Sequence, residues 1–149
     1  MYNTILVPLD GSKRAEAILP HVEELAQRYD AKVIFLHVVE PMPPVVGPEG
    51  LPVVLYEQGF EQRSRQAATY LEGVQDRFRK KGISTEASTV YGPVVEGILR
   101  AAEEEGVDLI ALASHGRSGL SQVFYGSVAA GVLHRVDRPL LLIRSRAGE

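Results

Sequence analysis

The sequence of 149 residues contains no cysteine, no tryptophan and no long apolar run. Without cysteine, disulfides, thiolate catalysis and cysteine-bound zinc are excluded. The longest uninterrupted apolar segments fall far short of the roughly 20 residues that a membrane-spanning helix needs. The first residues lead directly into an expected strand and lack the basic segment and apolar stretch of a signal peptide, so we expect a cytoplasmic protein.

An excess of charge of one sign is also missing. The net charge is -3, from 16 Lys and Arg against 19 Asp and Glu, and the basic residues are scattered along the chain. A basic surface that captures nucleic acid is therefore not expected. Hydrophobic residues make up 45% and charged residues 23%, which is typical of a soluble globular protein. The length fits one domain over residues 1–149.

Two common phosphate-binding motifs are absent. No Gly-Lys-Ser or Gly-Lys-Thr occurs, and the first expected strand is followed by Asp10-Gly11-Ser12-Lys13 instead of a dinucleotide fingerprint. The histidines at 21, 37, 115 and 134 show no metal-ligand spacing. A transition-metal site built by the protein alone is therefore not expected.

What is present is an alternation of short apolar strands with amphipathic helices. Ser12 is the expected N-cap of the first helix, and Pro20 inside that helix predicts a kink. The stretch 40–52, with five prolines and two glycines, predicts a long loop that acts as a lid or a partner surface. A second loop is expected over 114–125. The expected strands are 4–9, 32–39, 84–90, 109–113 and 139–144, and the expected helices are 13–29, 56–81, 93–106 and 126–136.

This alternation predicts an α/β fold with an open parallel sheet and helices on both of its faces. We expect five strands in the order 3-2-1-4-5. Sheets of this kind bind ligands at the carboxyl ends of the strands, where the strand order reverses. In this order the reversal falls between the first and fourth strands, so the residues that follow Leu9 and Ala113 are the candidates for a site.

The densest functional signal follows the fourth strand. The sequence Ala113-Ser114-His115-Gly116-Arg117-Ser118-Gly119 precedes Gly126-Ser127-Val128 at the start of a helix. Glycines allow the backbone to approach a ligand closely, and unpaired N–H groups at a helix N-terminus favour an anion. Serine hydroxyls and an arginine add donors and positive charge. The pattern predicts phosphate binding, with the alternative that Ser127 is only a helix cap.

These residues resemble the nucleotide loop of the universal stress protein family. Its ATP-binding branch carries Gly-x-x-Gly, nine residues, then Gly and Ser or Thr, and this chain has Ser114-His115-Gly116, nine residues and Gly126-Ser127. Ala113 stands where the family has its first glycine. The resemblance covers the whole chain, including Ile5 to Ser12, Leu36 to Val39 and Arg138 to Ile143. It implies a Rossmann-like fold of the adenine nucleotide alpha hydrolase kind, here a universal stress protein-like nucleotide-binding domain.

The resemblance also implies the ligand and the roles of individual residues. The ligand would be ATP, with ADP or AMP as alternatives, and Mg²⁺ would arrive with the phosphates. Pro8 and Val38 would frame the adenine, Val38 through its backbone. Asp10 would accept hydrogen bonds from the ribose hydroxyls or help to hold the metal, unless it only caps the first turn. The ribose and phosphates would be wrapped by Ala113, Ser114, His115, Gly116, Arg117, Ser118 and Gly119, and the phosphate tail would bind Gly126, Ser127 and Val128.

By resemblance the protein is a nucleotide-responsive stress and signalling regulator, with nucleotide occupancy as its switch. A dedicated phosphoryl-transfer enzyme is not supported, since no base, Walker lysine or carboxylate pair is evident. The alternatives are a slow ATPase, a nucleotidyl transferase and a ligand-free homodimeric interaction module. A transferase would want a His-x-Gly-His-like cluster, and the ligand-free branch is expected to replace the loop glycines and Gly126-Ser127. A flavodoxin-like carrier would need a Ser/Thr-rich loop after the first strand, which is missing.

The last expected strand predicts self-association. Leu140-Leu141-Leu142-Ile143 ends the sheet, and an apolar open edge invites pairing. Pairing with its own copy across a two-fold axis would remove that edge, and the resemblance implies the same homodimer. The alternative is that Arg144 and Arg146 blunt the edge of a monomer.

Overall fold

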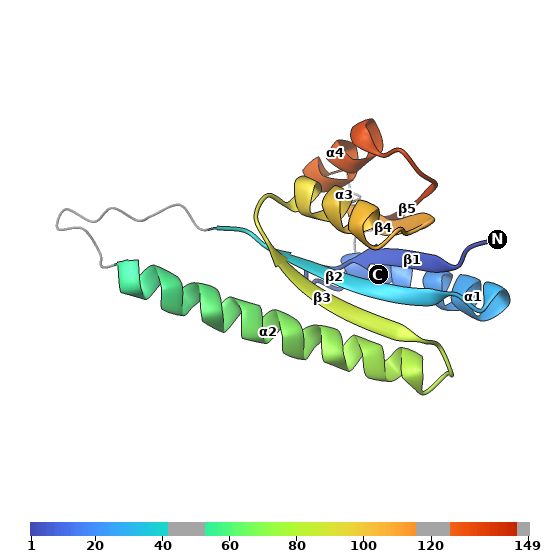
Figure 1. The fold of residues 1–149 in the computed structure, drawn as a ribbon, viewed down its shortest axis with the longest axis horizontal. Coiled ribbons are helices and arrows are strands. Elements are labelled where there is room, and N and C mark those ends of the chain that lie inside the picture. Colours follow the sequence, from blue (N-terminus) through green and yellow to red (C-terminus); the bar gives the residue numbers. More distant parts are fainter. Residues whose placement is uncertain (42–52, 116–125, 146–149) are drawn as a thin grey trace.

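A computed structural model describes residues 1–41, 53–115 and 126–145. Its centre is a five-stranded sheet in the order β3-β2-β1-β4-β5, and all four strand pairs are parallel (Figure 1). The predicted fold class and strand order are therefore confirmed. The strands are β1 (Thr4–Pro8), β2 (Lys32–Val39), β3 (Thr85–Tyr91), β4 (Leu109–His115) and β5 (Leu140–Ser145).

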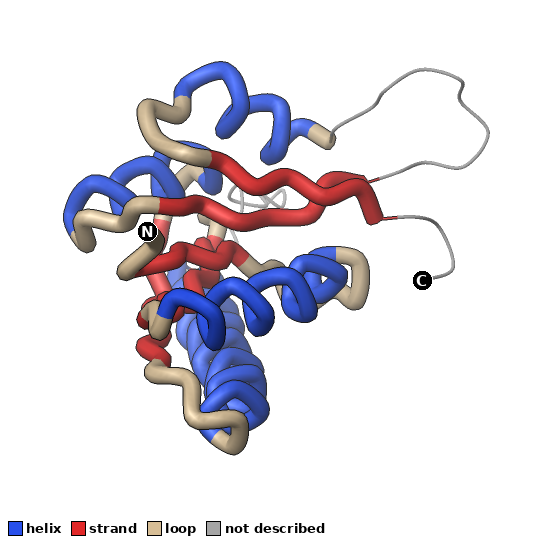
Figure 2. Tube along the Cα trace, turned by 90° about the vertical axis from the view of Figure 1, so that its right-hand side faces the viewer, coloured by secondary structure: helices blue, strands red, loops and turns tan. Residues whose placement is uncertain are grey.

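Helices cover both faces of this sheet, as the views in Figures 1 and 2 show. One face packs against the 3-10 turn η1 (Ala15–Ile18) and the helices α1 (Leu19–Tyr29) and α2 (Val53–Arg79). The other face packs against α3 (Val94–Glu104) and α4 (Ser127–Arg135). Successive strand residues point to opposite faces, so Ile5 and Val7 enter the first core whereas Leu6 enters the second.

The start of the first helix differs from the prediction. A single kinked helix over 13–29 was expected, but residues 15–18 form a 3-10 turn and the α-helix begins at Leu19. Pro20 therefore lies in the first turn of α1, where its missing N–H removes no helical hydrogen bond, so the reason for a kink disappears. The prediction of Ser12 as the N-cap of the first helix is wrong, because Arg14 is the N-cap of η1 and Ile18 is that of α1. Ser12 still contacts the start of the 3-10 turn, since its Oγ accepts a hydrogen bond from the Ala15 N–H at 3.2 Å.

The fourth strand is longer than predicted. A loop was expected from Ser114, but Ser114 and His115 continue β4 and pair with Arg144 and Ser145 of β5. Strand pairing at this end outweighs the polar character of these two residues. Of the two predicted loops, residues 42–52 and 116–125 lie outside the described residues.

The remaining boundaries agree within about three residues, and Gly82 after α2 has a φ of +78°, as expected for a C-cap glycine. In the part of the chain that the structure describes, no helix is both long enough and apolar enough to span a membrane.

Candidate functional site

A cavity of about 210 Å³ opens where the strand order reverses. Its walls come from the carboxyl ends of β1, β2 and β4 and from α3 and the start of α4. Elements far apart in the sequence meet here because parallel strands all end at the same edge of the sheet. Eight of the residues predicted for the site line this cavity: Pro8, Asp10, Val38, Ala113, Ser114, Gly126, Ser127 and Val128.

The structure does not test whether the other five predicted residues reach the cavity. His115 is the last residue of β4. Gly116, Arg117, Ser118 and Gly119 lie outside the described residues. The two ends of the predicted loop, Ser114 and Gly126, both lie on the cavity wall.

Asp10 lies two residues after the end of β1 and is exposed. Its Oδ1 accepts a hydrogen bond from the Ser12 N–H at 2.8 Å, which is the turn-capping contact considered from the sequence. That contact occupies one carboxylate oxygen. Oδ2 has no hydrogen-bond partner among the described residues, so the capping contact leaves it available to a ligand.

The start of α4 supplies backbone donors to the cavity. Gly126 is the N-cap, with φ 68° and ψ 153°, a backbone conformation that is essentially restricted to glycine. No side chain caps this end, so the first N–H groups of α4 are not satisfied by a cap. The interpretation of Ser127 as the cap is wrong, because Ser127 is the first helical residue and is exposed. N–H groups without a side-chain cap, together with the helix dipole, favour an anion here.

The opposite part of the wall is apolar. Val94 and Ile98 of α3 face the cavity together with Val38 at the end of β2. α3 approaches β2 closely, because a Cβ built on Gly97 would lie 3.0 Å from Val38 Cγ2. The cavity thus joins an apolar wall to a polar helix end.

Sequence reasoning missed several lining residues, among them Glu40, Val94 and Ile98. Glu40 follows β2 directly, so its place at the carboxyl edge was available as a signal. Val94 and Ile98 belonged to the apolar face expected for their helix, and nothing local separates a residue that packs in the core from one that lines a cavity.

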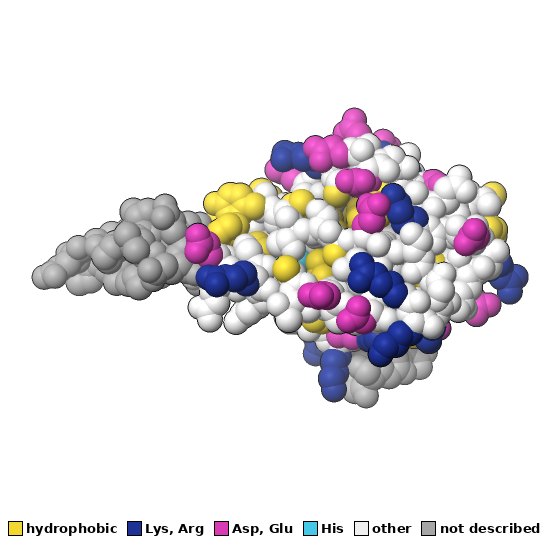
Figure 3. All heavy atoms as spheres, turned by 60° about the horizontal axis from the view of Figure 1, so that its bottom comes forward, with side chains coloured by type: hydrophobic (Ala, Val, Ile, Leu, Met, Phe, Trp, Pro, Cys, Tyr) yellow, Lys and Arg dark blue, Asp and Glu magenta, His cyan; other side chains and the backbone are white. Residues whose placement is uncertain are grey.

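Within the described ranges, the charged side chains that line the cavity are acidic. Asp10 and Glu40 are its carboxylates. Among the described residues, no group of three or more His, Cys, Asp or Glu side chains is placed to hold a metal ion. On the face of the molecule drawn in Figure 3, basic and acidic side chains are interspersed, without a broad basic area.

Comparison with known proteins gives consistent matches over the full chain. The model of the universal stress protein family matches residues 1–144. Universal stress protein MJ0577 of Methanocaldococcus jannaschii is 29% identical, over 98% of this chain and 97% of that protein. A universal stress protein of Thermus aquaticus is 30% identical, over 97% of this chain and 100% of its own length.

The solved structures agree. The structure of MJ0577 has a TM-score of 0.85 at 28% identity, and the match covers 99% of both chains. A universal stress protein family member from Burkholderia pseudomallei has a TM-score of 0.68 at 29% identity, over 95% of this chain and 96% of that one. With the strand order, the cavity at its reversal and these matches, the chain belongs to the universal stress protein family.

Proposed function

We propose that this chain is an ATP-binding regulatory protein of the cytoplasmic stress response, in which nucleotide occupancy is the switch. The observation that carries the proposal is the cavity at the strand reversal, where the uncapped N-terminus of α4 faces the apolar wall of β2 and α3. An adenine nucleotide needs both, an apolar surface for the base and backbone donors for the phosphates.

The proposed pose follows from this arrangement. The adenine lies against Pro8 and Val38, and the ribose hydroxyls donate to the free oxygen of Asp10. The phosphates lie at Gly126, Ser127 and Val128, and the residues from Ala113 to Gly119 close around them. Mg²⁺ binds with the phosphates and keeps part of its water shell.

Two further structures of this fold support an adenine nucleotide. One is a universal stress protein in complex with cAMP, with a TM-score of 0.68 at 23% identity. The other is an Arabidopsis thaliana family protein with AMP bound, with a TM-score of 0.67 at 18% identity. At these identities the likeness to this chain is one of fold.

The test is calorimetric titration of nucleotide-stripped protein with ATP, with and without Mg²⁺, on the parent and on Ser127→Glu. An acidic residue in the first turn of a helix leaves its stability unchanged or raises it, so the variant should fold. Its carboxylate would repel the phosphates, and we expect ATP affinity to fall about tenfold or more. Ser127→Gln is the matched control, with similar size and no charge.

Titration with adenosine completes the design. Because adenosine has no phosphate, both variants should bind it as the parent does. Equal ATP affinity in the parent and in Ser127→Glu would refute the placement of the phosphates at α4. Absence of binding to ATP, ADP and AMP would refute the nucleotide proposal and favour a ligand-free interaction module. Release of phosphate during the titration would indicate slow hydrolysis.

We also propose that the protein forms a homodimer through β5. Among the described residues, β5 pairs only with β4, and its side chains over Leu140-Leu141-Leu142-Ile143 are half-buried. An isologous pairing of two copies would cover them. Sedimentation at increasing protein concentration should show a dimer, and a species that stays monomeric at all concentrations would refute the proposal.

A further inference from the structure

A second cavity, of about 400 Å³, lies beside α2 at the carboxyl ends of β1 and β2. It shares Asp10, Val38 and Glu40 with the first cavity. The side chain of His37 lines only this second cavity, as expected from its place one residue before Val38 on a strand.

Three polar residues of α2 form the long wall. Arg63, Gln66 and Tyr70 follow each other at spacings of three and four residues, which places them on one face of the helix. Ala67, between them on the same wall, leaves room in front of the helix. Arg63 is anchored by Nη1, which donates to the Glu40 carbonyl oxygen at 2.9 Å, while its guanidinium lies 6.0 Å from the centre of the Phe60 ring.

This wall holds buried polar atoms without hydrogen-bond partners. Three buried side-chain polar atoms lack a hydrogen-bond partner among the described residues: Arg63 Nε, Tyr70 Oη and Ser145 Oγ. The first two belong to residues that line this cavity. Burying such groups unpaired is costly, and an arginine nitrogen can only donate. A ligand oxygen would accept from Arg63 Nε, and the Tyr70 hydroxyl oxygen could accept from a ligand donor.

The protonation of Tyr70 fits this role. Its burial and the nearby Glu16 carboxylate raise the pKa of the phenol well above its usual range, so the hydroxyl keeps its proton. Glu16 itself is engaged by Arg77, whose Nη1 lies 3.2 Å from Glu16 Oε1. The neutral phenol therefore keeps its oxygen lone pairs, which can accept from an ammonium group.

The charges of the remaining wall select against a simple ion. Asp10 and Glu40 contribute carboxylates that repel an anion, and Arg63 repels a cation. His37 Nδ1 lies 2.8 Å from the Leu9 carbonyl oxygen, to which it donates, so Nε2 is the ring nitrogen left for the cavity. Acceptors for a positive group and donors for a negative group thus face the same space.

We propose that this second cavity binds a small linear zwitterion, with its carboxylate at Arg63 and its ammonium group at the Asp10 end near Tyr70. Seven residues separate Arg63 from Tyr70, about 10 Å along a helix, so a chain of several methylenes fits better than an α-amino acid. The negative end of such a ligand would face the Arg63 guanidinium, and its positive end would face the Asp10 carboxylate. The ammonium end shares Asp10 with the proposed ribose contact, so binding is tested with the first cavity empty.

The test uses nucleotide-free, full-length protein and 5-aminopentanoate as the probe. Pentanoate and pentylammonium keep the chain and remove one charge each. Amide NMR shifts of the protein report affinity and location together. We expect saturable shifts around α2 and the ends of β1 and β2 with 5-aminopentanoate, and at least tenfold weaker binding of either single-charge compound.

Two variants test the roles of Arg63 and Tyr70. Arg63→Met keeps the length of the side chain and should weaken binding about tenfold or more, and Tyr70→Phe should weaken it about fivefold. Arg65→Met is the matched control, because Arg65 is exposed and does not line the cavity. The NMR spectra show whether each variant is folded.

Four results would overturn the proposal. They are no saturable shift with 5-aminopentanoate, equal binding of pentanoate, equal binding of pentylammonium, or a loss of binding in Arg65→Met as large as in Arg63→Met. The ATP titrations test the proposed function separately, because Arg63, Arg65 and Tyr70 do not line the first cavity.

Discussion

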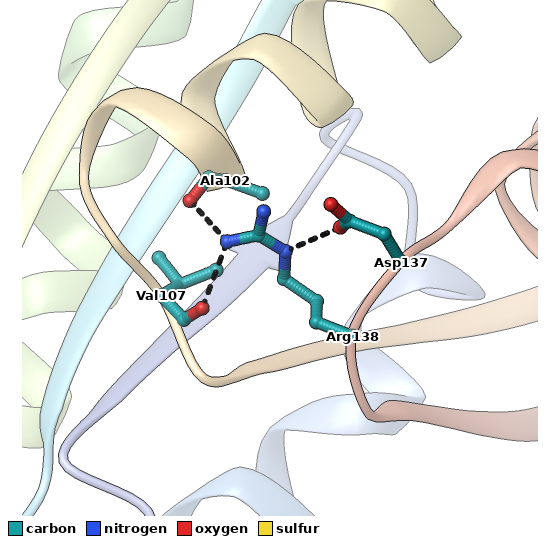
Figure 4. Close-up of polar contacts among 4 residues, drawn as sticks. All are labelled: Ala102, Val107, Asp137 and Arg138. Atoms are coloured by element: carbon teal, nitrogen blue, oxygen red, sulfur yellow. Dashed lines mark hydrogen bonds and ion pairs between the residues drawn. The ribbon is translucent and has the colours of Figure 1, made fainter.

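Replacing Arg138 should lower the stability of the protein clearly. This residue precedes β5, and its guanidinium reaches the end of α3 (Figure 4). Nη1 donates to the carbonyl oxygens of Ala102 at 2.7 Å and Val107 at 3.0 Å, and Nε donates to Asp137 Oδ1 at 2.9 Å. The arginine therefore ties the helix that walls the first cavity to the edge strand.

The size of the effect follows from these contacts. Hydrogen bonds from a charged donor contribute about 1.5–3 kcal/mol each when they are protected from water. Two carbonyl oxygens lose their donor in Arg138→Met, and the arginine side chain is 19% exposed, so a discount for solvent applies. We expect a loss of about 2–4 kcal/mol. At about 2–4 °C per kcal/mol for a chain of this size, Tm should fall by roughly 5–15 °C.

Thermal and urea unfolding of the parent and Arg138→Met measure this loss. Asp137→Asn is the first control, since Asp137 is 76% exposed and its removal leaves both carbonyl contacts in place. Arg28→Met is the second, because its ion pair with Glu24 is exposed on both sides. A fall in Tm no larger than that of the controls would refute the anchoring role of Arg138.

Three further changes have defined outcomes. Gly131→Ala places a Cβ 2.7 Å from Val95 Cγ2, so the Val95 side chain or the α3–α4 packing must shift. Despite the better helix propensity of alanine we expect a loss of about 1–2 kcal/mol in urea unfolding, and unchanged stability would contradict this packing. Gly126→Ala forces a side chain into φ 68° and should cost about 1–3 kcal/mol in the same assay, whereas no cost would mean that α4 begins differently. Burial and Glu16 raise the pKa of Tyr70 in the folded state, so the fold holds this proton more tightly than the unfolded chain and loses stability as pH rises above the ordinary tyrosine pKa of about 10. Tyr70→Phe should therefore flatten the alkaline fall in Tm, whereas Tyr91→Phe, at an exposed position, should not.

The order of the sheet was predictable from local sequence. Apolar segments such as Lys32–Val39 alternate with helical patterns, and right-handed crossovers leave few ways to arrange them. The cavity position follows from that order alone. The residues at the carboxyl ends of β1 and β4 could therefore be named in advance.

Other features depended on contacts between distant segments. β4 continues through His115 because β5 offers it backbone partners, which the polar sequence at that point does not reveal. The first helix begins late, at Leu19, although its apolar pattern starts earlier. In both places the local sequence pattern predicted the strand or helix, but contacts with other segments decided where it begins or ends.

The sequence by itself determined the fold class, the family and the cavity that eight predicted residues line, because these depend on the order of elements and on short glycine and serine patterns. Only the tertiary structure decided which helix residues join that cavity, that Gly126 rather than Ser127 caps α4, and that Arg63 and Tyr70 share a second cavity with Asp10. The physical reason is that periodicity fixes which face of an element is buried, whereas the partner that each buried side chain meets depends on how distant elements pack.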